Sequence, residues 1–239
     1  MARFGVFIEL ASPESVEMAG WAGWDHCVID CEHAPIDNAF LPNMLRAACI
    51  PAYVRVPNSN PESIQGALDN GAAGVIVPRL RSAGEARRVV EAARFFPHGK
   101  RGVNHMVRAA RYSLEPVAEY LAKAGEQTRV VVQIETAEAL ECVEAIAATP
   151  GLDELFIGPY DLSQALEIPG QVLDEKLLAA GRRILDAAHA NGLALSVFVN
   201  SDDAARIWLS LGADILHYSA DTYLLAEALK QTRERLRRL

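Results

Sequence analysis

Two patterns of apolar and polar positions alternate along this chain of 239 residues. One is a short run that is apolar almost throughout, and the other is a longer stretch rich in Ala, Leu, Glu and Arg with apolar residues at helical spacing. Short runs of the first kind are typical of strands that are buried on both faces of a parallel sheet. Eight of them are predicted as strands: Phe4–Ile8, Cys27–Asp30, Ala52–Val56, Gly74–Val77, Arg129–Ile134, Glu154–Ile157, Ala194–Val199 and Ile215–Tyr218.

The stretches between these runs carry the start and stop signals of helices. Ser12 and Asn60 each precede a proline, which favours a helix beginning at that proline. Ser82 and Thr136 are predicted to begin two further helices. Four glycines stand where a helix should end before the next strand: Gly71, Gly125, Gly192 and Gly212.

Eight strands that alternate with helices predict a (β/α)8 TIM barrel in a single domain spanning residues 1–239. An open, doubly wound sheet is the alternative, but no glycine-rich phosphate-binding fingerprint follows the first strand. Two segments, 96–111 and 167–174, are expected to be irregular. In a barrel of this kind the active-site groups lie at the carboxyl ends of the strands.

Composition narrows the class of protein. Hydrophobic residues make up 51% of the chain, enough for a sizeable core, and the formal net charge of −8 argues against nucleic acid as a partner. The four cysteines form no CxxC motif and are interpreted as reduced thiols. The first residues show no secretory signal pattern, and no apolar stretch reaches membrane-spanning length. We therefore expect a soluble, cytoplasmic protein with no membrane partner.

Two acidic residues follow two successive predicted strands. Glu135 comes directly after Ile134, and Asp161 comes a few residues after Ile157. Carboxylate oxygens held by rigid strand ends are what a hard divalent cation requires, and Mg²⁺, Mn²⁺ and Co²⁺ are all compatible with two carboxylates and open positions. The sequence therefore predicts a divalent metal site.

Other polar residues gather near strand ends, and each also has a purely structural interpretation. Asp30 could be a helix cap or a hydrogen-bonded buried acid, and His33 could be an ordinary loop histidine. Arg55, inside an apolar strand, could form a structural ion pair, while Asp69 resembles a surface acid at a helix end. Glu135 and Asp161 could cap helices. Together these residues nevertheless suggest a metal-assisted reaction on a small oxo acid.

The positions of the lysines argue against an aldolase that forms a Schiff base with its substrate. A Schiff-base enzyme needs a lysine at a strand end. The chain has four lysines, none of them at a predicted strand end: Lys100, Lys123, Lys176 and Lys230.

Six segments resemble, in order and spacing, the HpcH/HpaI aldolase family of metal-dependent class II pyruvate aldolases. They are VIDCEHAP, VRVP, GAAGVIVPRL, KRGVN, VVQIET and LDELFIGPYDLS. The resemblance runs from about Gly5 to the region of Asp221 and Thr222. It implies a barrel of the phosphoenolpyruvate/pyruvate superfamily type, usually assembled as a hexamer in which the last helix packs on a neighbouring subunit.

The resemblance also implies residue roles. Glu135 and Asp161 match the metal ligands, His33 the catalytic histidine and Asp69 the acid that pairs with it. Further matches are Arg55, which contacts the substrate oxo group; Gln133, near the substrate; and Asp30 and Glu32, acids that tune the site. Gly158, Pro159 and Tyr160 stand in a turn that opens a helix with Asp161, and the free amides of this turn can hold the substrate carboxylate.

The implied activity is reversible cleavage of a 4-hydroxy-2-oxo acid into pyruvate, or a related 2-oxo acid, and an aldehyde. Two alternatives stay open: a CoA-ester lyase of the citrate-lyase type, and a non-catalytic barrel that binds oxo acids. Cys31, Asn104 and Tyr160 depart from the commoner family residues. Since the Tyr160 ring could reshape the aldehyde side of the pocket, the sequence leaves the physiological aldehyde open.

Overall fold

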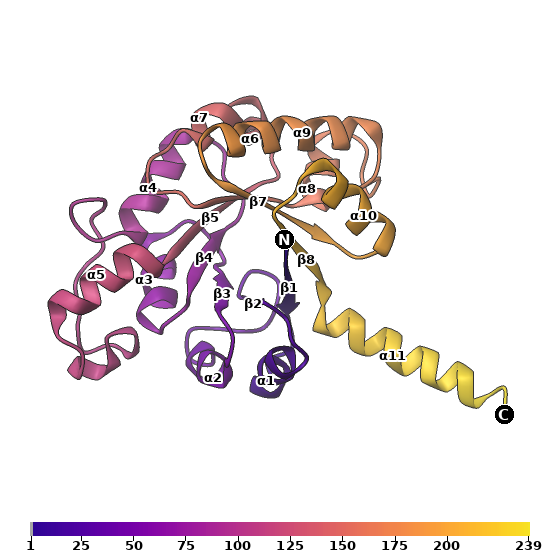
Figure 1. Ribbon diagram of the computed structural model, residues 1–239, viewed down its shortest axis with the longest axis horizontal. Helices are drawn as coiled ribbons and strands as arrows, with labels where there is room; N and C mark the ends of the chain where they lie inside the picture. The colour runs from indigo at the N-terminus through magenta and orange to yellow at the C-terminus, as the bar shows by residue number, and fades with distance from the viewer. Residues whose placement is uncertain (1) are drawn as a thin grey trace.

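The computed structural model describes residues 2–239, and its strands close into a parallel barrel in the order β1 to β8 (Figure 1). Its strands are β1 (Arg3–Ile8), β2 (His26–Asp30), β3 (Ala52–Arg55), β4 (Gly74–Val77), β5 (Arg129–Ile134), β6 (Glu154–Ile157), β7 (Ala194–Val199) and β8 (Ile215–Ala220). The predicted (β/α)8 barrel is confirmed, and the open doubly wound sheet is wrong. The predicted strand bounds are correct to within two residues.

Helices surround the barrel in the positions that the alternation predicts. They are α1 (Pro13–Trp21), α2 (Leu41–Ala47), α3 (Pro61–Asp69), α4 (Ala83–Ala93), α5 (Val117–Gln127), α6 (Ala137–Glu141), α7 (Val143–Ala147), α8 (Pro159–Ala165), α9 (Glu175–Ala190), α10 (Asp202–Leu211) and α11 (Asp221–Leu236), with a short 3-10 segment, η1 (Arg108–Ser113), before α5. Among residues 2–239, no helix combines the length and apolar character that crossing a bilayer requires.

Two of the predicted helix caps form as expected. The Ser82 hydroxyl accepts from the Glu85 amide at 3.2 Å, and the Thr136 hydroxyl accepts from the Ala139 amide at 3.1 Å. Ser12 and Asn60 precede α1 and α3 as predicted, but neither side chain caps its helix. The proline that follows each of them begins the helix without a side-chain bond, because its fixed φ already suits the first turn.

One helix-ending glycine is wrongly predicted. Gly71, Gly192 and Gly212 adopt a positive φ and follow α3, α9 and α10, whereas Gly125 lies inside α5. The helix is held by packing before Gly125: Tyr120 packs its ring against Phe95, with 5.6 Å between ring centroids, and Ala124 packs against the same cluster. One glycine costs a helix only about 1 kcal/mol, which such packing can offset.

The apolar core has two layers, one inside the barrel and one between the barrel and the helices. The inner layer contains Phe7, Val28, Ile76, Val131 and Phe156, with Phe198 packed against it. Residues on the other face of each strand pack against the helices. Burial on both faces explains why the strands read as nearly continuous apolar runs.

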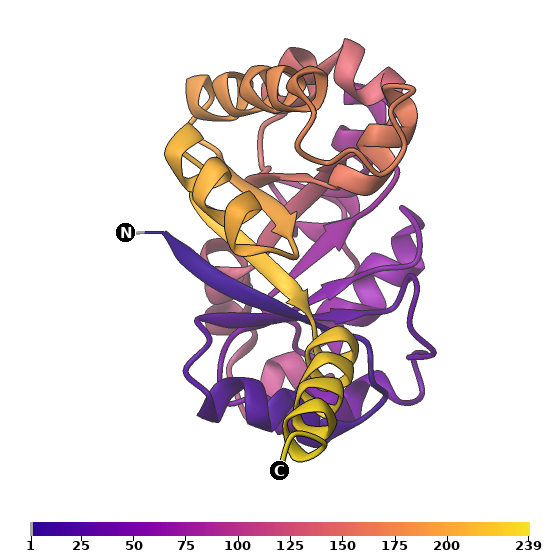
Figure 2. The same ribbon diagram turned by 90° about the vertical axis from the view of Figure 1, so that its right-hand side faces the viewer.

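The last helix, α11, extends away from the barrel (Figures 1 and 2). None of its residues is buried, and Leu225, Leu229 and Leu236 are exposed by 50%, 63% and 58%. Packing of this helix on a neighbouring subunit stays a prediction.

A polar cluster fills the barrel near the amino ends of the strands, below the aromatic rings. The His26 Nε2 and His217 Nδ1 atoms lie 3.4 Å apart, and the His217 Nε2 atom lies 3.9 Å from the Glu154 carboxylate. His26 is 3% exposed. Burial, with the nearby charges of His217 and Arg3, lowers the pKa of His26 from 6.5 to about 3.

This cluster predicts loss of stability in acid. His26 binds a proton in the unfolded chain below pH 6.5 but in the folded chain only near pH 3, so the stability that neutral His26 supplies falls between these values. At pH 4.5 the loss should be about 2–3 kcal/mol. Urea unfolding of wild type and of His26→Gln should therefore give free energies that converge by this amount between pH 7.5 and 4.5. Parallel curves would rule out His26 as the source.

Candidate active site at the carboxyl end of the barrel

Two carboxylates, those of Glu135 and Asp161, lie at the carboxyl end of the barrel, as the sequence predicts. Ile134 pairs with Ile157 in the register of β5 and β6, so the residues that follow these two strands emerge side by side. Glu135 follows β5 at once, and Asp161 is the third residue of α8. The Asp161 charge acts on Glu135 strongly enough to help raise the pKa of Glu135.

Glu135 is buried and held at both oxygens. Its Oε1 accepts from the Arg79 amide at 2.7 Å, and its Oε2 accepts from the Gln133 side-chain amide. Arg79 adopts a left-handed backbone, φ 56°, which directs its amide at this carboxylate. Burial is the main cause that raises the pKa of Glu135 to about 7, and Asp161 adds to it. A carboxyl fixed in this way favours a nearby cation, because a cation would restore its charge.

The donor set fits a divalent cation. The Oε1 atom of Gln133 is buried and has no hydrogen-bond partner within residues 2–239, although its own amide group contacts Glu135. An orphaned buried oxygen beside two carboxylates is suited to a cation or to a water of its hydration shell. In the part of the chain that the structure describes, no three His, Cys, Asp or Glu side chains form a metal cluster. A two-carboxylate site suits a cation that keeps water or substrate oxygens as its other ligands.

Gly158 is a glycine because the site leaves no room for a side chain. A Cβ atom at this position would overlap the Gln133 amide nitrogen and lie 2.6 Å from Glu135 Oε2. Gly158 is also the residue that precedes α8, the helix that contains Asp161. The chain therefore passes close to the Glu135 carboxylate at the point where α8 begins.

The Gly158→Ala variant should therefore lose activity more than stability. The methyl group must displace both Gln133 and Glu135, and a shift of about 1 Å in a catalytic group can cost about 100-fold in rate. We expect a loss of about 10- to 100-fold in kcat with little change in Tm. Steady-state kinetics and thermal unfolding check this. A Gly170→Ala variant is the control for activity, because a Cβ added there would meet no atom of another part of the chain within 4 Å. Unchanged kcat would show that the two side chains adapt.

Arg55 lies across the mouth from α8 and is fixed by Asp30. Its Nε and Nη2 atoms donate to the two carboxylate oxygens of Asp30 at 2.9 and 2.7 Å. The two residues are register partners in β2 and β3, so the ion pair follows directly from the strand pairing. Burial disfavours the charged guanidinium, but the bonds and charge of Asp30 outweigh it, and the pKa of Arg55 is raised. The guanidinium also lies over the Phe7 ring, 4.9 Å from its centroid.

Glu32 links two arginines. Its carboxylate is 3.4 Å from Arg55 Nε and 3.0 Å from Arg79 Nε, with its side chain only 5% exposed. Burial raises the pKa of Glu32, while Arg55, His33 and Arg79 oppose that shift. Asp30 and Glu32 thus hold Arg55, and Glu32 also draws the Arg79 side chain toward the site.

His33 lines the pocket, and its side chain is 54% exposed. Its Nε2 atom lies 3.8 Å from Glu32. The expected pairing with Asp69 is not formed within the chain. Asp69 ends α3, which runs back toward the amino ends of the strands, and its carboxylate accepts from Arg101 Nη2 at 2.6 Å. Sequence position could not reveal this separation, because it depends on the direction of the helix that carries Asp69.

These groups surround a pocket of about 170 Å³ at the carboxyl end of the barrel. Its lining comprises Phe7, Glu9, His33, Arg55, Gln133, Phe156, Gly158, Pro159, Tyr160, Asp161 and Phe198. The volume is below the roughly 300–1,000 Å³ of typical drug-sized ligand sites. The pocket is therefore suited to small molecules.

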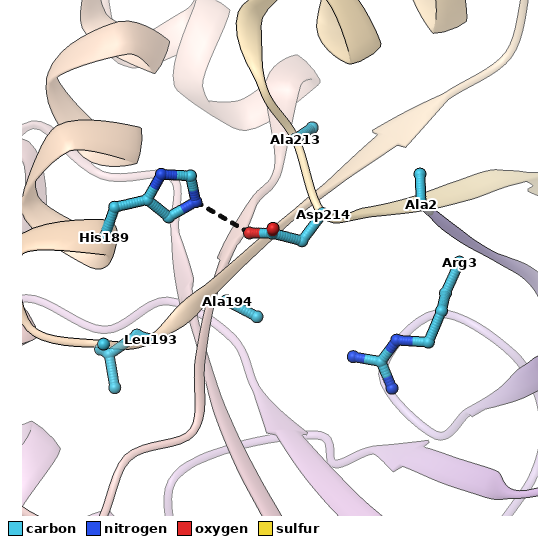
Figure 3. A pocket seen from close by; sticks show the side chains of 8 residues that line it. Ala2, Arg3, His189, Leu193, Ala194, Ala213 and Asp214 are labelled. Atoms are coloured by element: carbon cyan, nitrogen blue, oxygen red, sulfur yellow. Dashed lines mark hydrogen bonds and ion pairs between the residues drawn. The ribbon is translucent and has the colours of Figure 1, made fainter.

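A larger hollow, of about 550 Å³, lies at the opposite end of the barrel (Figure 3). Among the residues that line it, His189 Nε2 lies 2.9 Å from Asp214 Oδ2. The same carboxylate oxygen accepts from the Leu195 amide, so Asp214 secures the loop before β8 to β7. The amino-terminal face of a barrel usually serves stability, and this pair fits that role.

Sequence reasoning assigned no role to four groups at this end of the barrel. Arg79, Glu9 and Asn200 each follow a strand closely, which is the signal that identified Glu135. Phe198 lies within β7 and gave no signal, since an aromatic residue in a strand usually belongs to the core. Only the closed barrel shows that its ring reaches the pocket.

Comparisons with known proteins agree with one another. The family model for HpcH/HpaI aldolase/citrate lyase matches residues 3–228. A hydroxypyruvate/pyruvate aldolase from Chromohalobacter salexigens is 34% identical over 96% of this chain and 91% of its own length. A 5-keto-4-deoxy-D-glucarate aldolase from Shigella dysenteriae is 33% identical over 96% and 90%. A solved HpcH/HpaI aldolase/citrate lyase family protein from Burkholderia cenocepacia has a TM-score of 0.93 and 35% identity, covering 99% of this chain and 95% of that one.

Proposed function

Since the chain belongs to the HpcH/HpaI aldolase/citrate lyase family, we propose that it is a class II aldolase that reversibly cleaves a 4-hydroxy-2-oxo acid into pyruvate, or a related 2-oxo acid, and an aldehyde. It is a carbon–carbon lyase. The observation that carries the proposal is the Glu135 and Asp161 pair beside Gln133 and Arg55 at the carboxyl end of the barrel.

Glu135 and Asp161 would hold a divalent cation, Mg²⁺, Mn²⁺ or Co²⁺. When bound, such a cation supplies Lewis-acid polarisation of the oxo group next to the bond that breaks. The orphaned Gln133 Oε1 supports this placement, because it lies beside the same carboxylate and lacks a partner within residues 2–239.

Arg55 and α8 would bind the oxo acid. The Arg55 guanidinium is charged, preorganised by Asp30 and located at the pocket wall, so it can stabilise negative charge that develops on the oxo oxygen. The amides of Tyr160 and Asp161, in the first turn of α8, can hold the substrate carboxylate. With Arg55 at its oxo group and the α8 amides at its carboxylate, a small oxo acid would be held in one orientation.

His33 would take the proton of the aldol hydroxyl. We expect His33→Ala to lower kcat for cleavage by about 100- to 10,000-fold, the usual contribution of a positioned base, while oxo-acid binding changes little. Coupled kinetics and titration calorimetry with pyruvate measure the two quantities. Full turnover by the variant would exclude His33 as the base, and lost pyruvate binding would assign it to binding instead.

The test of function is pyruvate release from a panel of 4-hydroxy-2-oxo acids, coupled to a dehydrogenase. Release that stops with chelator and returns with Mn²⁺ or Mg²⁺ supports a metal-dependent aldolase. Release that is insensitive to chelator would exclude the metal, and release only from CoA esters would establish the citrate-lyase alternative. The absence of any release, together with tight pyruvate binding, would favour the non-catalytic barrel.

Pocket size favours the aldolase over the CoA-ester lyase. About 170 Å³, closed by Phe7, Phe156 and Phe198, leaves room for small acids and aldehydes. The pocket is lined by both Asp161 and Arg55, and Glu135 contacts Gln133 in the same lining; a non-catalytic binding site does not require these groups together.

We propose a cytoplasmic homohexamer as its working state. The exposed leucines of α11 support packing on a neighbouring copy, and free cysteines fit a reducing compartment. Because Asp69 and His33 lie at different ends of the barrel in one chain, the pairing implied by the family could form only between two copies.

A further inference from the structure

One wall of the pocket is chemically unlike the other. Phe198 and Asn200 come from β7 and the residue that follows it, while Arg55 ends β3. Strands three and seven of an eight-strand barrel face each other across its axis. Phe198 therefore lies across the pocket from Arg55, the group that would bind the oxo oxygen, and Asn200 follows it in the chain. An aldehyde would approach on this side, away from Arg55.

Tyr160 contributes a hydroxyl donor to this wall. Its ring leans on the Phe198 ring, with 6.2 Å between centroids, and its hydroxyl accepts from the Asn200 side-chain amide. A phenol that accepts in this way keeps its own proton free to donate. Tyr160 is 45% exposed and lines the pocket, so that proton is available to a ligand.

Glu9 contributes an anionic acceptor. It follows β1 and lines the same pocket. The Thr222 hydroxyl donates to Glu9 Oε2 at 2.7 Å, and the Glu9 amide donates to Asp221 Oδ1 at 2.8 Å, so both backbone and side chain are fixed. Within residues 2–239 the other Glu9 oxygen makes no hydrogen bond to protein.

This wall lacks a cation that could receive a second carboxylate. Among the residues that line the pocket, the basic ones are Arg55 and His33. Arg55 is already bonded to both oxygens of Asp30, and His33 comes from the loop after β2 on the other side. An aldehyde that carried a carboxylate would meet Glu9 without a compensating charge, and like charges brought together disfavour a partner.

We propose that Glu9 and Tyr160, whose hydroxyl is positioned by Asn200, select a short, uncharged aldehyde that carries a hydroxyl group, and reject aldehydes that carry a carboxylate. Glu9 accepts the hydroxyl proton, and Tyr160 donates to an oxygen of the same molecule. The inference rests on the proposed aldolase activity. The reaction balances without an oxidant: the pyruvate methyl carbon loses a proton and bonds to the aldehyde carbon, whose oxygen becomes the new hydroxyl by taking up a proton.

The experiment measures kcat/KM for condensation of pyruvate, with Mn²⁺, onto three aldehydes. Glyceraldehyde is neutral and hydroxylated, propionaldehyde is neutral without a hydroxyl, and succinic semialdehyde is anionic. Wild type should prefer them in that order. Tyr160→Phe should lower the glyceraldehyde-to-propionaldehyde ratio by about 3- to 10-fold, the effect of one hydrogen bond. Glu9→Gln should raise the ratio of succinic semialdehyde to glyceraldehyde by about 10-fold or more.

Matched controls remove the same chemical groups elsewhere. Glu126→Gln removes an exposed carboxylate on α5, and Tyr112→Phe removes a hydroxyl from a residue that is 59% exposed. Neither should change a selectivity ratio. A wild type that prefers the anionic aldehyde, or ratios that stay constant in both Glu9→Gln and Tyr160→Phe, would overturn the inference.

A second measurement separates this failure from failure of the aldolase proposal. Exchange of the pyruvate methyl protons with deuterium from solvent, followed by NMR with Mn²⁺ and no aldehyde, reports the oxo-acid half of the reaction alone. If the pyruvate protons exchange but the aldehyde preference differs from the expected order, only the proposed aldehyde selectivity is rejected. The absence of both exchange and condensation would reject the proposed function, and the selectivity with it.

Discussion

The Asp161→Ala variant should lose cation-dependent activity by 1,000-fold or more while it keeps its fold. Asp161 is one of two carboxylates that would hold the cation, and Lewis-acid stabilisation by a bound metal is worth several kcal/mol. The side chain is exposed in the first turn of α8. Its structural contribution there is the interaction with the helix dipole, about 0.3–1 kcal/mol.

Two measurements check this result. Titration calorimetry with Mn²⁺ should show cation binding in wild type and its loss in the variant, and coupled pyruvate release should fall in parallel. Circular dichroism should show an unchanged fold. Asp186→Ala, which removes an exposed carboxylate from α9, is the control. Full metal-dependent turnover by Asp161→Ala would remove this residue from the ligand set.

The second large effect is expected at Arg55, where stability and catalysis should both suffer. Arg55→Ala leaves Asp30, which is fully buried, without its bidentate partner. Breaking a buried ion pair on one side costs about 3–5 kcal/mol. The same substitution removes the guanidinium from the pocket wall, and loss of one such electrostatic stabiliser lowers kcat by about 100- to 1,000-fold.

Arg55→Lys separates the two effects. Lysine keeps the charge but cannot offer the planar fork that meets both Asp30 oxygens. We expect it to recover part of the stability, measured by urea unfolding, while kcat per folded molecule stays low. Arg79→Ala is the matched control, because that side chain is 65% exposed and contacts Glu32 at one point; its loss should cost at most about 1 kcal/mol. Normal kcat in Arg55→Ala would confine Arg55 to a structural role.

Much of the candidate site was accessible to sequence reasoning because barrel topology is regular. Once eight strands are identified, residues that follow them share one end of the barrel. Glu135, Arg55 and His33 were found by that rule, and the structure places each of them there. The rule applies equally to Glu9 and Asn200, which were overlooked only because no motif drew attention to them.

Other features depend on contacts that no local pattern encodes. The left-handed backbone of Arg79, which aims an amide at Glu135, occurs at a residue type that gives no warning of it. The orphaned Gln133 oxygen results from side-chain packing around Gly158. Asp69 does not lie beside His33 within one chain, and its distance along the chain from β3 says nothing about which end of the barrel α3 reaches.

The sequence by itself determined the barrel and the position of its two candidate metal-binding carboxylates. Burial on both faces requires apolar strands, and the polar residues that follow them collect at one end whatever the details of packing. Only the tertiary structure decided how those residues are used. Strand register joined Arg55 to Asp30, barrel closure brought Phe198 and Glu9 to the pocket, and the return of α3 carried Asp69 away. The alternation of side chains along a strand determines which face of the sheet each residue occupies. Contacts between distant strands depend instead on how the sheet closes into a barrel.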